Sequence, residues 1–207
     1  MKHLIAAASI LLLALSVAAG AKPRFTATWK APGAENVAYA GKKVVGLVVS
    51  DDLSLRMSAE EALARQLTAR GVQGVAAYRL IPREEVRDKE RAKAWFEKSG
   101  AAGVVIMRLV DLTKETTPSV VVWQSGNYYG SLWSYYPYAW GATFDISPSR
   151  TDVTVVIETL VFDVGNSRLL WAGTSESTNP EGAQKLVEEI VDAAADQMKK
   201  DGLIRAK

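Results

Sequence analysis

The chain combines an amino-terminal export pattern with a complete absence of cysteine, and this pair of features constrains its fold most strongly. Residues 1–21 contain the basic Lys2, an apolar run that ends at Leu15, and small residues that fit an A-x-A cleavage site at 19–21. The apolar run is shorter than the roughly 20 residues that cross a bilayer. We therefore expect a cleaved signal peptide, a mature chain that begins at Lys22, and no transmembrane span after cleavage; the alternative is an uncleaved amino-terminal tether.

An exported domain without disulfides must be stabilised by its hydrophobic core. We expect residues 22–207 to form a single domain, since a chain of this length can bury a sizeable interior. The missing cysteine also removes the usual site of a lipid anchor at the end of the signal. The predicted location is therefore the periplasm or the exterior of the cell.

The composition also limits the possible chemistry. The single histidine, His3, leaves with the signal peptide, so the mature chain has no histidine and no cysteine. This excludes Ser-His-Asp and Cys-His catalysis and removes the usual ligands of zinc and copper. Carboxylates remain, either as acid and base or as ligands of a hard cation. We expect no cofactor and no enzymatic activity.

The overall charge gives little information about partners. The chain has 25 Lys and Arg residues against 23 Asp and Glu residues, which is a nearly balanced surface. Such a balance favours neither a nucleic acid nor an anionic membrane as the binding partner.

The first half of the mature chain alternates between strand and helix patterns. Residues 22–30 alternate like a short strand, and residues 44–49 are apolar on both faces, as in a central strand covered by helices. Ser58 and Glu61 form a capping box, which predicts a helix that begins at Ser58 and ends at Gly71.

The same alternation continues further along the chain. The sequence predicts a strand near Val75 to Leu80, a helix from about Arg83 to Lys98, and a buried strand from Val104 to Leu112. The resulting order β-α-β-α-β predicts a parallel sheet with right-handed crossovers.

The second half has a different pattern. Residues 153–175 contain two alternating runs separated by a Gly-Asn turn, which predicts an antiparallel hairpin. A helix is expected to begin at Asn179-Pro180, and its apolar face, which includes Ile190, should pack on the sheet. The predicted fold class is α/β, an α+β sandwich: a mixed sheet with a β-α-β-α-β front half, an antiparallel hairpin and a C-terminal helix.

Aromatic residues are concentrated in a segment at residues 123–148, called the aromatic segment below. Nine of the 17 Trp, Tyr and Phe residues lie between positions 123 and 144, and no charged residue occurs from 116 to 144. Glycine and proline interrupt this run, so we expect an irregular loop. We predict that it binds a partner through Tyr128, Tyr129, Trp133, Tyr135, Tyr136, Tyr138 and Trp140. The alternative, equally weighted, is that the segment folds back and fills a gap over the sheet.

A second candidate site is acidic. Asp51 and Asp52 follow the first buried strand, and Asp111 lies near the end of a later parallel strand. Because ligands bind at the carboxyl ends of strands in open α/β sheets, these carboxylates could hold Mg²⁺ or Ca²⁺. The favoured interpretation is structural: Asp51 and Asp52 accept hydrogen bonds from backbone amides in the turn before a helix, and Asp111 faces solvent. We therefore predict no metal site.

Two parts of the sequence resemble known envelope proteins. The hairpin segment VVIETLVFDVGNSRLLWAGTSE, with its Leu-x-Trp-x-Gly return strand ending at Gly173, resembles a family of exported bacterial envelope proteins of unknown function. The front half, with VVGLVVSDD at 44–52 and GAAGVVI at 100–106, is similar to the α/β module shared by the amino-terminal domain of TolB and the CsgG and LpoB lipoproteins. The resemblance implies a fold and an envelope location, and it carries over no catalytic residue.

The observations from the sequence favour a non-enzymatic binding or assembly domain of the periplasm or cell envelope. Its partner would be an envelope protein or a glycan, held through the aromatic segment. Two alternatives remain open: an enzyme that acts on glycans through carboxylates such as Asp51, Asp52 and Asp111, or a purely structural envelope component.

Overall fold

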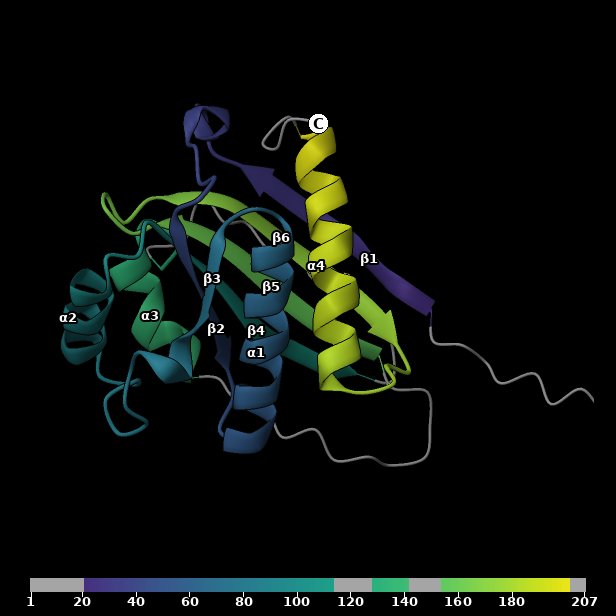
Figure 1. Cartoon of the computed structure of the whole chain (residues 1–207). Helices are drawn as coiled ribbons and strands as arrows, with labels where there is room; N and C mark the ends of the chain where they lie inside the picture. The colour runs from purple at the N-terminus through teal and green to yellow at the C-terminus, as the bar shows by residue number, and fades with distance from the viewer. Residues whose placement is uncertain (1–20, 114–127, 142–153, 202–207) are drawn as a thin grey trace, which may run out of the picture.

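The computed structural model describes residues 21–113, 128–141 and 154–201, which form one mixed sheet of six strands with helices on both faces (Figure 1). The strands are β1 (Ala21–Lys30), β2 (Lys43–Val49), β3 (Gln73–Ala76), β4 (Gly103–Thr113), β5 (Thr154–Asp163) and β6 (Leu169–Thr178). The helices are α1 (Leu53–Ala69), α2 (Lys89–Ser99), α3 (Leu132–Gly141) and α4 (Ala183–Lys200), with the short 3₁₀ turns η1 (Ala34–Asn36) and η2 (Ala77–Arg79).

The sheet has a parallel half and an antiparallel half that meet at β4. The strand order is β1-β6-β5-β4-β2-β3. β2 pairs in parallel with both β3 and β4, and β5 and β6 form an antiparallel hairpin beside β4. β1 returns to pair with β6 at the other edge. The predicted mixed sheet, with its β-α-β-α-β front half and closing hairpin, is confirmed.

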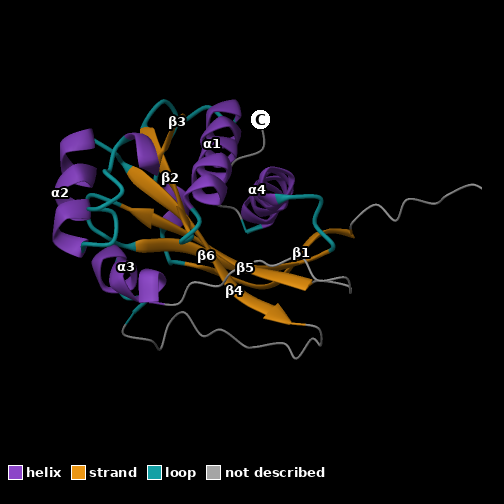
Figure 2. Cartoon of the chain, turned by 90° about the horizontal axis from the view of Figure 1, so that it is seen from below, coloured by secondary structure: helices purple, strands orange, loops and turns teal. Residues whose placement is uncertain are grey.

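Helices α1 and α4 cover one face of the sheet, and α2 and α3 lie against the other (Figure 2). Alternate residues of each strand supply the two cores. Val44 and Val105 point to the α1/α4 side, whereas Val45 and Val104 point to the α2/α3 side. This alternation explains why the central strands are apolar throughout.

The C-terminal helix α4 docks on the sheet as its periodicity predicts. Leu186, Val187, Ile190 and Val191 are all buried, and Ile190 is 1% exposed. The helix begins at Ala183 after Gly182, however, so the predicted start at Asn179-Pro180 is wrong. Asn179 adopts a positive φ of 51°, and the chain needs this turn to leave β6 before the helix can start.

Helix α1 begins at Leu53, so the predicted capping box at Ser58 is wrong. The true N-cap is Asp52, whose carboxylate accepts a hydrogen bond from Leu55 N at 3.1 Å. Ser58 lies inside the helix. The additional first turn is stabilised by Arg56, which pairs with Glu60 four residues later at 2.9 Å.

Helix α2 begins at Lys89, later than the predicted start at Arg83. Its N-cap is Asp88, which accepts hydrogen bonds from the backbone N–H groups of Glu90 and Arg91 at 3.0 Å each. Residues 83–88 form turns instead. An N-cap carboxylate fixes where a helix starts because it satisfies amide donors that have no partner within the helix.

Among the described residues, no helix combines the length and apolar composition that crossing a membrane would require.

Candidate functional site

The described part of the aromatic segment is mostly a helix, so the predicted loop is wrong for residues 132–141. Ser131 starts the helix: its hydroxyl accepts a hydrogen bond from Ser134 N at 3.2 Å, and its carbonyl accepts one from Tyr135 N at 3.0 Å. Helix α3 continues to Gly141 with Pro137 inside it. Residues 123–127 and 142–148 of the predicted loop lie outside the described residues.

One face of α3 is part of the hydrophobic core. Its buried residues are spaced as on one side of a helix: Leu132, Tyr135, Tyr136, Ala139 and Trp140. Tyr135 and Tyr136 are both 0% exposed, and the Tyr136 ring packs edge-on against Phe96 at a centroid distance of 6.3 Å. The Tyr136 hydroxyl donates to Val86 O at 2.7 Å. The prediction that Tyr135 and Tyr136 form a contact surface is therefore wrong, because packing leaves neither side chain accessible.

Beneath α3, the sheet carries a buried ion pair. Arg108 on β4 and Glu158 on β5 occupy paired positions in the register, with Nη2 and Oε2 3.2 Å apart. Their side chains are 4% and 1% exposed. A buried ion pair is tolerated only when additional hydrogen bonds satisfy its remaining polar atoms.

Tyrosines of the aromatic segment provide those bonds. The Tyr135 hydroxyl donates to Glu158 Oε2 at 2.7 Å, and the Tyr129 hydroxyl donates to Glu158 Oε1 at 2.8 Å. Burial and the neighbouring Glu158 carboxylate raise the pKa of both tyrosines, so both remain protonated donors at neutral pH. Both carboxylate oxygens of Glu158 are occupied, and the arrangement ties α3 to the sheet rather than leaving a reactive group free.

The outer part of the segment is more accessible. Tyr128 is 51% exposed, and its ring stacks on Tyr138 with a centroid distance of 4.5 Å and an interplanar angle of 17°. Arg108 lies over the Tyr138 ring at 4.9 Å from its centroid. Trp133 is partly buried against Phe96, at 5.8 Å between ring centroids. The predicted site residues Tyr128, Trp133 and Tyr138 are thus partly open to a partner.

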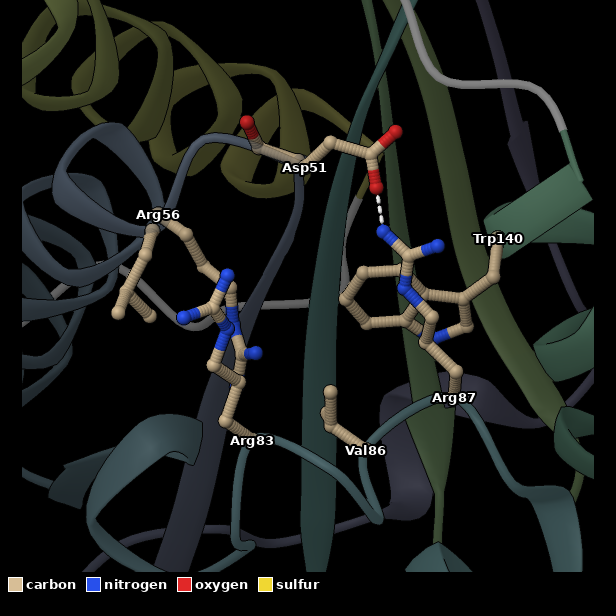
Figure 3. A pocket seen from close by; sticks show the side chains of 8 residues that line it. Asp51, Arg56, Arg83, Val86, Arg87 and Trp140 are labelled. Atoms are coloured by element: carbon tan, nitrogen blue, oxygen red, sulfur yellow. Dashed lines mark ion pairs between the residues drawn. The ribbon is translucent and has the colours of Figure 1, made fainter.

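Trp140 lies apart from this outer group. It is 8% exposed and lines a cavity between β2, α1 and the turns before α2, together with Asp51 (Figure 3). Three arginines share this cavity, Arg56, Arg83 and Arg87, and none of them is among the predicted site residues. Arg56 lies on α1, whereas Arg83 and Arg87 lie in the turns before α2, and no pattern in the sequence indicates that the two segments meet.

Two of the three predicted acidic residues, Asp51 and Asp52, have structural partners. Asp51 forms an ion pair with Arg87, and Asp52 caps α1. The side chain of Asp111 is not among those described, but its backbone lies on β4 opposite Val156. Across the described parts of the chain, no three acidic side chains come together as potential metal ligands. The structural interpretation of Asp52 as a residue that satisfies backbone amides is confirmed.

Comparison with known proteins gives similarity to solved structures only. No family model and no curated protein matches the sequence, so the resemblance of the hairpin to an envelope family stays a prediction. A PelC dodecamer from Paraburkholderia phytofirmans matches with 15% identity and a TM-score of 0.48, over 89% of this chain and 99% of that chain. The lipoprotein GNA1162 from Neisseria meningitidis matches with 16% identity and a TM-score of 0.39, over 78% of this chain and 99% of that chain. Similarity at this level says nothing about activity or partners.

Proposed function

We propose that this chain is an exported, non-enzymatic binding or assembly domain of the cell envelope, located in the periplasm or secreted. Its contact surface is the outer part of the aromatic segment: Tyr128, Tyr129, Trp133 and Tyr138. Export is supported by the signal pattern at residues 1–21. The observation that carries the proposal is Tyr128, which is half exposed and yet held flat against Tyr138.

The stacked pair has the physical properties of a binding platform. Tyr138 contacts both Arg108 on the sheet and the ring of Tyr128, and these contacts hold the outer ring in place before any partner arrives. A fixed aromatic ring loses little conformational freedom on binding, and its hydroxyl keeps a polar edge for hydrogen bonding. Interfaces concentrate binding energy in such tyrosines.

Buried residues of the same segment have a structural role. Tyr135 and Tyr136 are fully enclosed, and this favours internal packing for the inner face of α3. The structural alternative thus applies to one face of the helix, and the binding proposal is limited to the other. The partner remains an envelope protein or a glycan, since both present surfaces that pack on tyrosine rings.

The alternative of a carboxylate enzyme acting on glycans loses support from two of its three residues. A glycosidase needs one carboxyl group as an acid and a second as a base or nucleophile. Asp51 is paired with Arg87 and Asp52 caps a helix, so each already has a structural partner.

Replacement of Tyr128 by Ala tests the proposal. We expect unchanged thermal unfolding, because the side chain is mostly outside the core, and a loss of binding of about 30-fold, which corresponds to the roughly 2 kcal/mol of an interface hot spot. Met57→Ala is the matched control, because Met57 is 36% exposed and lies on α1.

Two assays distinguish the partner class. To detect a glycan partner, soluble peptidoglycan fragments are added to the protein and binding is measured from the change in its tryptophan fluorescence. To detect a protein partner, the chain is cross-linked in intact cells and the linked protein is identified. If Tyr128→Ala and Met57→Ala behave like the wild-type protein in both assays, the contact surface does not lie at Tyr128.

A further inference from the structure

A cavity of about 150 Å³ lies where β2 ends and α1 begins, and arginine side chains dominate its wall. It is lined by Ser50, Asp51, Leu53, Arg56, Arg83, Val86, Arg87 and Trp140. Figure 3 shows the charged side chains, which approach from α1, from the turn after β2 and from the turns before α2, with Trp140 from α3. The site is separate from the proposed contact surface around Tyr128, and it does not depend on that proposal.

The buried guanidinium group of Arg56 is the main evidence for a binding site in this cavity. Its side chain is 3% exposed, and its Nε donates to Glu60 Oε1 at 2.9 Å. Its Nη2 is buried and has no hydrogen-bond partner among the described residues. A buried guanidinium donor without an acceptor is unfavourable, because it has lost water and gained nothing in return. An acceptor in the cavity would satisfy it.

Glu60 holds Arg56 through Nε and does not accept a hydrogen bond from Nη2. Its Oε1 already accepts from Val48 N at 3.2 Å and from Arg56 Nε, and its Oε2 accepts from Tyr78 N at 2.6 Å. The carboxylate thus holds Arg56 in place from behind and leaves the far end of the guanidinium facing the cavity.

The other two arginines increase the positive charge. Within the described residues Arg83 makes no ion pair, and in Figure 3 its guanidinium and that of Arg56 point toward one another. Arg87 pairs with Asp51, and its guanidinium lies 5.5 Å from the centroid of the Trp140 ring. The guanidinium of Arg56 lies 5.6 Å from the same centroid. Three guanidinium groups therefore share the wall with one carboxylate, with Glu60 behind Arg56 as the other acidic group in contact.

We propose that this cavity binds a small oxyanion, either a phosphate or a carboxylate group. Guanidinium groups form paired hydrogen bonds with both, and an anion between Arg56 and Arg83 would neutralise two like charges that face one another. The volume of about 150 Å³ is sufficient for one such group.

The main test measures binding of inorganic phosphate to the mature chain by calorimetry at low salt. We expect saturable binding, weakened about tenfold or more by Arg83→Gln, because each charge-assisted hydrogen bond contributes at least that much. Arg83 is exposed and unpaired within the described residues, so the variant should keep the wild-type fold, as circular dichroism can verify. Arg65→Gln is the matched control: Arg65 is a 54% exposed arginine on α1, paired with Glu188 and outside the cavity wall.

A second variant should act in the opposite direction. Asp51→Asn removes the carboxylate that competes for Arg87, so phosphate should bind more tightly than in the wild-type protein. Titrations with glucuronic acid and with an acidic oligosaccharide then separate a free anion from an anionic group on an envelope polymer. Absence of binding at millimolar phosphate, or equal affinity for the wild type and Arg83→Gln, would overturn the proposal.

Discussion

The two faces of the sheet are packed by different means. On the α1/α4 face the main hydrophobic cluster is mostly aliphatic, with Leu63, Leu186 and Ile190 among its buried members. On the α2/α3 face aromatic rings cover an ion pair, and tyrosine hydroxyls complete its hydrogen bonds. Both faces are well buried, and α1 carries the buried Arg56–Glu60 pair, but the aliphatic cluster around Ile190 contains no such polar partner.

This difference shows which kind of packing requires particular residue pairs. An aliphatic core gains stability in proportion to the area it buries, with little dependence on direction. A buried polar network is stable only when every member has its partner, because an unpaired charge in the interior is costly. The Arg108–Glu158 network on the α2/α3 face should therefore lose much of its stability when one polar group is removed, whereas the aliphatic cluster on the α1/α4 face should lose stability in proportion to the volume removed.

The largest expected effect tests the polar face. Glu158→Ala leaves Arg108 buried without its carboxylate and removes the acceptor of Tyr129 and Tyr135, so we expect a loss of about 3 to 5 kcal/mol of unfolding free energy. Chemical denaturation measures it, with Glu97→Ala on α2 as the control, since Glu97 is 63% exposed. A loss within about 0.5 kcal/mol, the range of surface substitutions, would contradict the comparison.

The next effect tests the aliphatic face. Ile190 is 1% exposed, so Ile190→Ala should cost about 2 to 5 kcal/mol through lost burial and a residual cavity. Lys185→Ala on the same helix, 53% exposed, should change stability by less than about 0.5 kcal/mol. Equal melting temperatures for the two variants would mean that α4 does not dock on this face.

The smallest effect isolates one hydrogen bond and its pH dependence. Tyr135→Phe removes a bond to a charged group, which should cost about 1.5 to 3 kcal/mol at neutral pH. Burial raises the pKa of Tyr135 well above the ordinary value of about 10. The unfolded chain therefore releases this proton above about pH 10 while the folded chain keeps it, so the stabilisation by Tyr135 decreases as pH rises.

The direction of this pH dependence can be measured directly. The difference in unfolding free energy between the wild type and Tyr135→Phe should shrink by about 1.4 kcal/mol for each pH unit above about 10. Denaturation curves at about pH 8 and about pH 11 provide the two values. A difference that stays constant or grows would show that Tyr135 ionises as readily in the folded protein as in the unfolded one.

Much of the fold could be predicted from the sequence because its elements have strong local patterns. The strand at 44–49, the hairpin and the packed face of α4 were confirmed. Helix starts were less predictable: Ser58 and Asp52 are both good N-cap residues, and only the folded chain shows which of them meets a free amide donor.

Helix α3 was missed for a different reason. Leu132, Tyr135, Tyr136, Ala139 and Trp140 follow a helical spacing, and Ser131 is a suitable N-cap. The spacing was hidden because Trp133 and Tyr138, on the other face, are as aromatic as the buried residues. A periodicity argument needs polar residues between the apolar ones, and this uncharged segment has few.

The sequence by itself determined the export pattern, the absence of cysteine, the absence of histidine after position 3, the strand and helix character of most elements, and the apolar faces that form the core. Each of these depends on composition or on residues within one element. Tertiary structure decided which aromatic rings are buried and which are open, and it paired Arg108 with Glu158 across two strands. It also brought Arg56, Arg83 and Arg87 to one cavity. These contacts join residues far apart in the chain, and they depend on the strand register and the crossovers of the sheet, which local patterns do not specify.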